Sequence, residues 1–217
     1  MLERWITALH TEEPGLEEPS ATRERLKERF PRGATRRMTQ LGMLLGITLE
    51  PLCLNENDTV VYASGYAETR ALEGYLDSFP SASPTLFQTS IHPSAVQQAL
   101  ILRQQPVRQF FPMTGSACLP AQALQVALLA ETPRTILCGG EERGTWLLEK
   151  GVASDRSFAF ALALSPSPAG AIGRLTLNSE SSARAALMLP AFFDLLHARQ
   201  PFDAPISPSL RLTLTWS

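Results

Sequence analysis

Apolar residues follow two different periods within one stretch of the chain, residues 109–130. A run that contains Phe110, Phe111 and Met113 precedes a short segment of small residues, Thr114–Cys118, after which apolar residues return at helical spacing. This change of period predicts a buried strand that leads through a tight turn into a buried helix. α/β enzymes often hold a nucleophile at such an elbow, because a helix N-terminus favours developing negative charge.

The other segments alternate between strand and helix patterns. Alternating or short continuous apolar runs predict extended segments at 5–9 (at a sheet edge), 59–63, 86–91, 134–138, 157–164, 171–177 and 210–216. Apolar residues at every third or fourth position predict helices at 20–30, 35–49, 67–79, 92–102 and 187–199. Two of these helices are each expected to bury one face. In the helix at 35–49 this face is formed by Met38, Leu41, Leu45 and Leu49, and in the helix at 67–79 by Ala71, Leu72, Tyr75 and Leu76. Strands that alternate with helices indicate a layered α/β domain whose mixed sheet is covered by helices.

Composition narrows the class of protein. The 217 residues are 44% hydrophobic and 18% charged, which is typical of a globular domain, and the net charge of −2 leaves no basic face for nucleic acid. The three cysteines have no CxxC or His-paired spacing and are expected to pack as reduced thiols. No metal or cofactor is expected, since no metal-ligand spacing and no glycine-rich phosphate loop occurs. With no apolar run of about 20 residues and no apolar N-terminus, we expect a cytoplasmic protein.

Several short motifs resemble the N-terminal half of β-ketoacyl synthases, which have the thiolase fold. Arg36–Leu41 is similar to the RRMS-type start of their first long helix, and Val61–Gly65 to their first core strand. Ser83–Pro93 is similar to the S-P-x-x-F…N segment that lines their acyl tunnel. Cys138–Glu141 is similar to their A-G-G-x-E strand end, and Phe158–Leu164 to the last strand of that half. The resemblance implies a thiolase-like half, with a mixed five-stranded sheet layered with helices.

A shorter group of half-length ketosynthase-like proteins resembles the chain more closely. These occur with aryl-polyene and related fatty acid or polyketide pathways, where they are regarded as chain length factors for a full-length ketosynthase. Their S-x-H-N-A-A motif corresponds to Ser90–Ala95, and their aromatic-tipped tail corresponds to Trp216. The resemblance covers essentially the whole chain and implies a single ketosynthase-like domain over residues 1–217, with a tail at 170–217 that adds a strand, a helix and a strand.

The residue at the nucleophile position can be identified by counting. Pro93 stands where the family has its tunnel Asn, and 23 residues further lies Ser116, which is the family's distance from that Asn to its catalytic Cys. Matching the family's T-A-C to Ser116-Ala117-Cys118 would favour Cys118 instead, but requires a two-residue insertion. We prefer the ungapped alignment, in which Ser116 replaces the Cys. A serine without a general base is a poor nucleophile at neutral pH. Gly115 is expected to be required by the tight turn.

Catalytic partners for such a nucleophile are missing from the sequence pattern. The family's two basic residues lie in its C-terminal half, and this chain ends before that half would begin. His10, His92 and His197 lack the catalytic context and are interpreted as structural histidines. Glu141 and Glu142 follow a double glycine and are interpreted as a solvated turn. A basic patch for carrier protein would have to come from Arg36, Arg37, Arg103 and Arg108.

The resulting hypothesis is a non-catalytic subunit, a chain length factor, that pairs with a full-length ketosynthase as a heterodimer and meets acyl carrier protein only indirectly. In the thiolase fold, the strand before the elbow lies at the two-fold axis of the dimer, where it pairs with its counterpart. The residues expected at the tunnel or interface are Phe87, His92, Gln109, Phe110, Phe111, Met113 and Thr114. Two alternatives stay open: a stand-alone acyltransferase or thioesterase-like enzyme that uses Cys118 or Ser116, and a structural homodimer.

Overall fold

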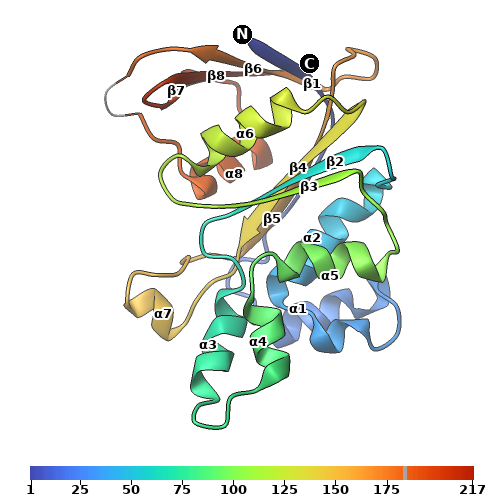
Figure 1. The fold of residues 1–217 in the computed structure, drawn as a ribbon, viewed down its shortest axis with the longest axis vertical. Coiled ribbons are helices and arrows are strands. Elements are labelled where there is room, and N and C mark those ends of the chain that lie inside the picture. Colours follow the sequence, from blue (N-terminus) through green and yellow to red (C-terminus); the bar gives the residue numbers. More distant parts are fainter. Residues whose placement is uncertain (183–184) are drawn as a thin grey trace.

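The computed structural model describes residues 1–182 and 185–217, and within these residues eight strands form one mixed sheet (Figure 1). The strand order is β3-β2-β4-β5-β1-β6-β8-β7. β2 runs parallel to β3 and to β4, and the other neighbours are antiparallel. The strands are β1 (Leu2–Glu12), β2 (Asp58–Ser64), β3 (Gln109–Thr114), β4 (Arg134–Glu141), β5 (Phe158–Ser165), β6 (Gly173–Ser179), β7 (Phe202–Ser207) and β8 (Leu210–Trp216).

Helices cover both faces of this sheet (Figure 1). One face packs against α1 (Pro19–Leu26), α2 (Gln40–Leu49) and α5 (Ser94–Leu102), around a core that contains Leu44, Tyr62 and Val96. The other face packs against α6 (Leu119–Leu129) and α8 (Leu189–His197), around Phe160, Leu124 and Phe193. α3 (Thr69–Asp77) and α4 (Pro84–Ser90) form a hairpin that projects from one end of the molecule, and α7 (Trp146–Glu149) is a single short turn.

The predicted α/β architecture is confirmed, but the sheet is larger than predicted. Strands β3-β2-β4-β5-β1 correspond to the five expected strands, and the tail adds β6, β8 and β7 beyond them. The first strand therefore lies between β5 and β6 and not at the edge, where we predicted it. The sequence analysis missed β7, because Pro205 interrupts its short apolar pattern. The tail thus completes the sheet on the side opposite to β3.

Two predictions about the α3–α4 region were wrong. Residues 86–91 were expected to be extended, yet α4 occupies Pro84–Ser90, because the Ser83 side chain accepts the Leu86 N–H at 3.3 Å and Pro84 begins the helix. Leu72 and Leu76 in α3 were expected to be buried and are 36% and 40% exposed.

The long helix predicted at residues 35–49 also differs. It begins only at Gln40 and is buried on nearly every side, not along one stripe. A short 3-10 turn, Ala34–Arg37, precedes it.

The double glycine does not end β4, as the sequence suggested, but continues it to Glu141. A Cβ atom at Gly140 would clash with the carbonyl oxygen of Phe158 on the neighbouring strand β5, so glycine permits the close approach of the two backbones. Cys138, just before it, is buried as predicted. Cys53 is exposed, contrary to the prediction that all three cysteines are packed, and Cys118 is partly buried.

Candidate functional site

The elbow joins β3 to α6 and opens into a cavity of about 660 Å3. Gly115 and Ser116 line it, and so does Gly65, which follows the neighbouring strand β2. The Thr114 hydroxyl lies 3.5 Å from the carbonyl oxygen of Gly65, within reach of a weak hydrogen bond. The start of α8, contributed by the tail, also lines the cavity, through Met188, Leu189 and Pro190. The tail therefore contributes to the cavity, although residues 114–117 of the elbow are themselves exposed.

The glycine that matters for this geometry is Gly65 and not Gly115. A Cβ atom at Gly115 would make only ordinary contacts, of 3.9 Å or more, so our expectation that the turn requires glycine there was wrong. A Cβ atom at Gly65 would lie 3.1 Å from the Gly115 carbonyl oxygen and 3.1 Å from Glu141 Oε1. The missing Cβ at Gly65 thus lets the ends of β2 and β3 meet.

The two candidate nucleophiles differ in exposure and in position relative to α6. Ser116 is exposed and lines the elbow cavity, and its carbonyl oxygen accepts the Leu119 N–H at 3.2 Å. Cys118 is partly buried at the N-terminal boundary of α6 and caps no backbone N–H with its side chain. In the described part of the chain, the residues that line this cavity include no histidine. The assignment of the nucleophile position to Ser116 stays a prediction.

Glu141 is a buried acid in the elbow cavity, contrary to the solvated turn that we predicted. Its carboxylate accepts the Gly65 N–H at 2.6 Å, the Tyr66 N–H at 3.0 Å and the Ser64 hydroxyl at 3.3 Å. Burial raises the pKa of Glu141 to about 7, although these donors favour the charged form. These hydrogen bonds fix the turn after β2.

Glu142 is also buried, and it joins two helices. Its carboxylate accepts the Gln40 N–H at the start of α2 at 2.9 Å and the Arg70 N–H at the start of α3 at 3.0 Å. Burial raises the pKa of Glu142 to about 7. Each helix N-terminus has unsatisfied N–H groups, so a carboxylate there is favoured by hydrogen bonding and by the helix dipole.

Two further buried acids act in the same way. Glu68 accepts the Ala95 N–H of α5 at 2.6 Å, and burial raises the pKa of Glu68 to about 7. Glu73 accepts the N–H groups of Thr145 and Leu147, at 2.6 and 3.0 Å, around the start of α7. Neither α5 nor α7 has a side-chain cap from its own N-cap residue. Acids distant in sequence therefore supply these caps.

β3 forms an exposed apolar edge of the sheet and is not the buried strand that we predicted. Among the described residues it pairs only with β2, from Thr59↔Gln109 to Ser64↔Thr114. Phe110 and Met113 are partly buried, and Phe111 is 39% exposed. Phe111, Val126 and Leu129 of α6 help to line a groove of about 430 Å3 beside this edge. An edge strand with open hydrogen-bonding groups and apolar side chains is a template for pairing.

The predicted tunnel and interface residues divide between the two faces of β3. Phe110 packs against the core beneath α2 and α5, whereas Met113 packs against the core beneath α6. Because side chains alternate along a strand, Gln109 and Phe111 share the face of Met113. Phe87 lies on α4, is 48% exposed, and its ring is 5.3 Å from that of Tyr75.

Two of the three histidines, His92 and His197, stack on aromatic rings. The His92 ring stacks on Tyr62 at 5.1 Å, and both of its ring nitrogens are buried without a hydrogen-bond partner among the described residues. Burial lowers the pKa of His92 and that of His10. His197 ends α8, where its Nδ1 lies 2.9 Å from the Thr11 hydroxyl. These contacts favour the structural interpretation.

The candidate basic patch is dispersed. Arg103 pairs with Glu50 at 3.1 Å, and Arg108 lies near the start of β3. Arg36 and Arg37 line a separate cavity.

Comparisons with known proteins bear on the fold. No family model matches the chain, and no curated protein matches it in sequence. The structure is similar to a chain of the ketosynthase ApeO in complex with its chain length factor ApeC from Xenorhabdus doucetiae, with a TM-score of 0.72 and 19% identity. That match covers 98% of this chain and 100% of the other, so the two chains have about the same length.

Two other solved structures are also similar to this chain in fold. The ishigamide ketosynthase/chain length factor gives a TM-score of 0.62 at 12% identity, over 82% of this chain and 68% of that chain. A third similar structure is the complex AntDE:AntF, a type II polyketide synthase acyl-carrier protein with its ketosynthase bound to the hexaketide. Its TM-score is 0.57 at 10% identity, and the match covers 84% of this chain and 71% of that chain. The predicted thiolase-like fold of a ketosynthase half is therefore confirmed. No helix of the described residues is long and apolar enough to cross a membrane.

Proposed function

We propose that this chain, as one domain over residues 1–217, is a non-catalytic ketosynthase-like subunit that acts as a chain length factor. It forms a heterodimer with a full-length β-ketoacyl-ACP synthase in polyene, fatty acid or polyketide biosynthesis. The observation that carries this proposal is the apolar edge strand β3, which within the described residues pairs on one side only and leaves Phe111 39% exposed. Fully burying an exposed large apolar side chain contributes about 1.5–3 kcal/mol, so covering the exposed part of Phe111 would contribute roughly 1 kcal/mol and favours a partner at this edge.

The match to a solved chain of the same length, in a complex of a ketosynthase with its chain length factor, supports this partner class. In such a heterodimer, β3 would pair with the corresponding strand of the ketosynthase and extend one sheet across the interface. Phe111 and Met113 would then contact the partner on the α6 side. Phe87 and Phe110, on the opposite side of the sheet, would approach the wall of the partner's acyl tunnel.

The elbow supports a subunit without its own chemistry. Ser116 would need a general base to attack a thioester at neutral pH. Glu141 is engaged by three hydrogen-bond donors, so it is poorly placed for that role. Acyl carrier protein would deliver its acyl chain to the ketosynthase, and this subunit would limit the space available to the growing chain.

The test is co-expression with the full-length ketosynthase encoded nearby, followed by size-exclusion chromatography with light scattering. A one-to-one complex that elongates acyl chains supports the proposal. A chain that stays alone, folded and rapidly labelled by iodoacetamide at Cys118, contradicts it and favours a separate enzyme.

Replacing both Ser116 and Cys118 with Ala should leave the elongation rate of the complex within about twofold of the wild type, because neither side chain takes the acyl group. The measurement is product formation from malonyl-loaded carrier protein. A matched Cys→Ala change at the nucleophile of the ketosynthase should abolish product. Loss of elongation in the Ser116/Cys118 variant would show that this elbow is catalytic.

Replacing Phe87 with Ala should lengthen the products, because a smaller side chain leaves more space at the end of the tunnel. Replacing Phe87 with Trp should shorten them. Mass spectrometry of the released acyl chains measures both effects, and Leu16→Ala, at an exposed loop residue, is the control. An unchanged product distribution in both Phe87 variants would rule out a steric role for this side chain.

A further inference from the structure

The strands at the two edges of the sheet, β3 and β7, each contain one proline (Figure 1). These are Pro112 in β3 and Pro205 in β7. Proline has no N–H group, so it removes one hydrogen bond from any ladder that it faces, and natural sheets use edge prolines against unwanted pairing. β3 thus combines an exposed apolar side chain, Phe111, which favours a partner strand, with a residue that weakens pairing.

The nitrogen of Pro112 faces the open edge and not β2. In a parallel ladder, alternate residues turn both their N–H and their C=O toward the same neighbour. The register between β2 and β3 runs along all of β3 without a shift, and it includes Tyr62↔Pro112. A proline that faced β2 would remove a bond from the middle of this ladder, which sheets avoid. The backbone groups of Phe110, Pro112 and Thr114 therefore point outward, toward any strand that pairs with this edge.

Pairing between two copies of β3 would place this proline in the ladder twice. Two copies of one chain usually associate through a two-fold axis, with the same surface on both sides. An axis perpendicular to the sheet makes the two copies of β3 antiparallel, and their outward groups at 110, 112 and 114 form the ladder. β3 has six residues and Pro112 is the fourth, so a ladder along most of the strand includes it. Each copy then lacks one N–H donor, and the ladder loses two hydrogen bonds.

Pairing with a different protein loses only one of these bonds. A partner strand without proline at the facing position has all of its own N–H donors, and only the donor missing at Pro112 is lost. The apolar surface of Phe111 is available to either kind of partner. One hydrogen bond changes an association constant roughly fivefold, so the missing donors favour a partner that differs from this chain.

We infer that Pro112 is a specificity-determining residue of the β3 edge, which disfavours pairing with a second copy of this chain and leaves the edge to a strand of the ketosynthase. The identity of that partner rests on the proposed function, whereas the effect on self-pairing does not depend on it. Pro112 is exposed, so its role concerns the edge and not the core. The inference selects the heterodimer over the structural homodimer, which were alternatives in the sequence analysis.

The experiment compares the wild type with Pro112→Val, which restores the N–H group and favours an extended backbone. Sedimentation equilibrium of the chain alone measures the Kd of the homodimer, and surface plasmon resonance with immobilised ketosynthase measures that of the heterodimer. We expect Pro112→Val to lower the homodimer Kd about 25-fold and the heterodimer Kd only about fivefold, because two donors return in the former and one in the latter. The thermal unfolding midpoint should not fall.

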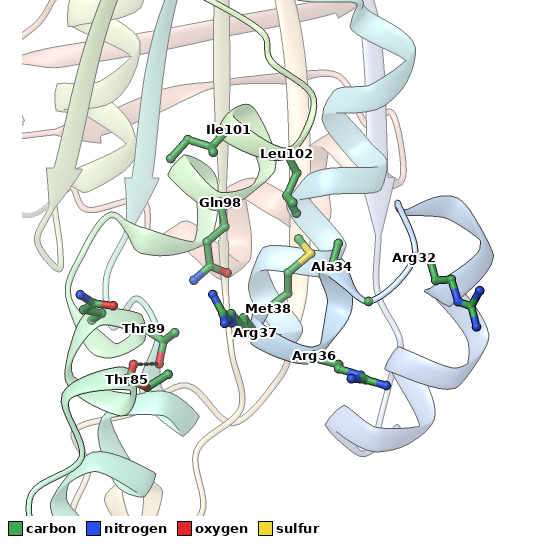
Figure 2. Close-up of a pocket in the computed structure, with 12 residues that line it drawn as sticks. Arg32, Ala34, Arg36, Arg37, Met38, Thr85, Thr89, Gln98, Ile101 and Leu102 are labelled. Atoms are coloured by element: carbon green, nitrogen blue, oxygen red, sulfur yellow. Dashed lines mark hydrogen bonds between the residues drawn. The ribbon is translucent and has the colours of Figure 1, made fainter.

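Two controls identify the strand responsible. Pro205→Val makes the same change at the other edge and should leave both Kd values unchanged, because a register shift follows Pro205 and disrupts the edge at β7. Adding Phe111→Asp to Pro112→Val should reverse the gain in self-association, whereas adding Ile101→Asp should not. Ile101 is 73% exposed on α5, and Figure 2 shows it at a cavity to which no residue of β3 contributes.

An unchanged homodimer Kd in Pro112→Val would overturn the inference, as would equal gains in the homodimer and the heterodimer. A gain that Pro205→Val reproduces, or that persists with Phe111→Asp, would also overturn it. So would a wild-type chain that associates with itself as tightly as with the ketosynthase. If no complex with the ketosynthase forms, the proposed function fails, and the homodimer comparison still decides the role of Pro112.

Discussion

Replacing Phe111 with Asp is expected to abolish co-purification with the ketosynthase. Phe111 lies in the middle of β3, where a paired partner strand would exclude water from its side chain. A carboxylate in that place would be buried without a counter-charge, which costs about 3–5 kcal/mol, or roughly a 100-fold or greater loss of affinity. The dissociation constant, measured by surface plasmon resonance with immobilised ketosynthase, tests this result.

The isolated Phe111→Asp chain should remain folded, because the side chain is 39% exposed when β3 is unpaired. Its thermal midpoint therefore distinguishes a lost interface from a lost fold. Val152→Asp is the matched control, since Val152 is an exposed apolar residue, 53% accessible, that lies outside β3. An unchanged affinity in Phe111→Asp would show that this edge is not the interface with the ketosynthase.

Replacing Glu142 with Ala should lower the free energy of unfolding by about 2–6 kcal/mol. The change removes the acceptor for two backbone N–H groups, of Gln40 and Arg70, and each buried N–H left without a partner costs about 1–3 kcal/mol. Urea denaturation followed by circular dichroism measures the difference. The control is Glu131→Ala, at an exposed acid, which should change stability by less than about 0.5 kcal/mol.

Glu142 should also make the free energy of unfolding depend on pH, with a contribution that falls as the pH rises. Burial raises the pKa of Glu142 to about 7 from its ordinary value of 4.5, so between these values the folded state binds more protons than the unfolded state. This contribution is fully present below about pH 4.5 and is lost as the pH rises through about 7. His10 and His92, with lowered pKa values, act in the opposite direction.

The comparison with Glu142→Gln separates these contributions, because the amide does not titrate. The stability of the Gln variant relative to the wild type should rise between pH 5 and pH 7.5. A constant difference across that range would mean that Glu142 is ionised throughout. A difference that falls as the pH rises would mean that its pKa is lowered, contrary to the effect of burial.

The sequence pattern identified most of the elements but misjudged how several of them are buried. The period of the apolar residues located the strand before the elbow and the helix after it correctly. It could not show that β3 lies at the edge of the sheet, because an apolar strand has the same pattern whether the chain itself or another protein covers it. Glu141 and Glu142 were misread for a related reason: two acids after a double glycine usually lie in solvent.

Most of the order of strands and helices, except α4 and β7, the ketosynthase-like fold and the position of the elbow were determined by local periodicity and short motifs, which act over a few residues. The tertiary structure alone decided the edge position of β3, the contribution of the tail to the elbow cavity, and the capping of α2 and α3 by Glu142. The acid and the N–H groups it accepts are separated by 102 residues for Gln40 and by 72 for Arg70. Hydrogen bonds across such separations form only when the folded sheet brings the helix ends together, so no local pattern can encode them.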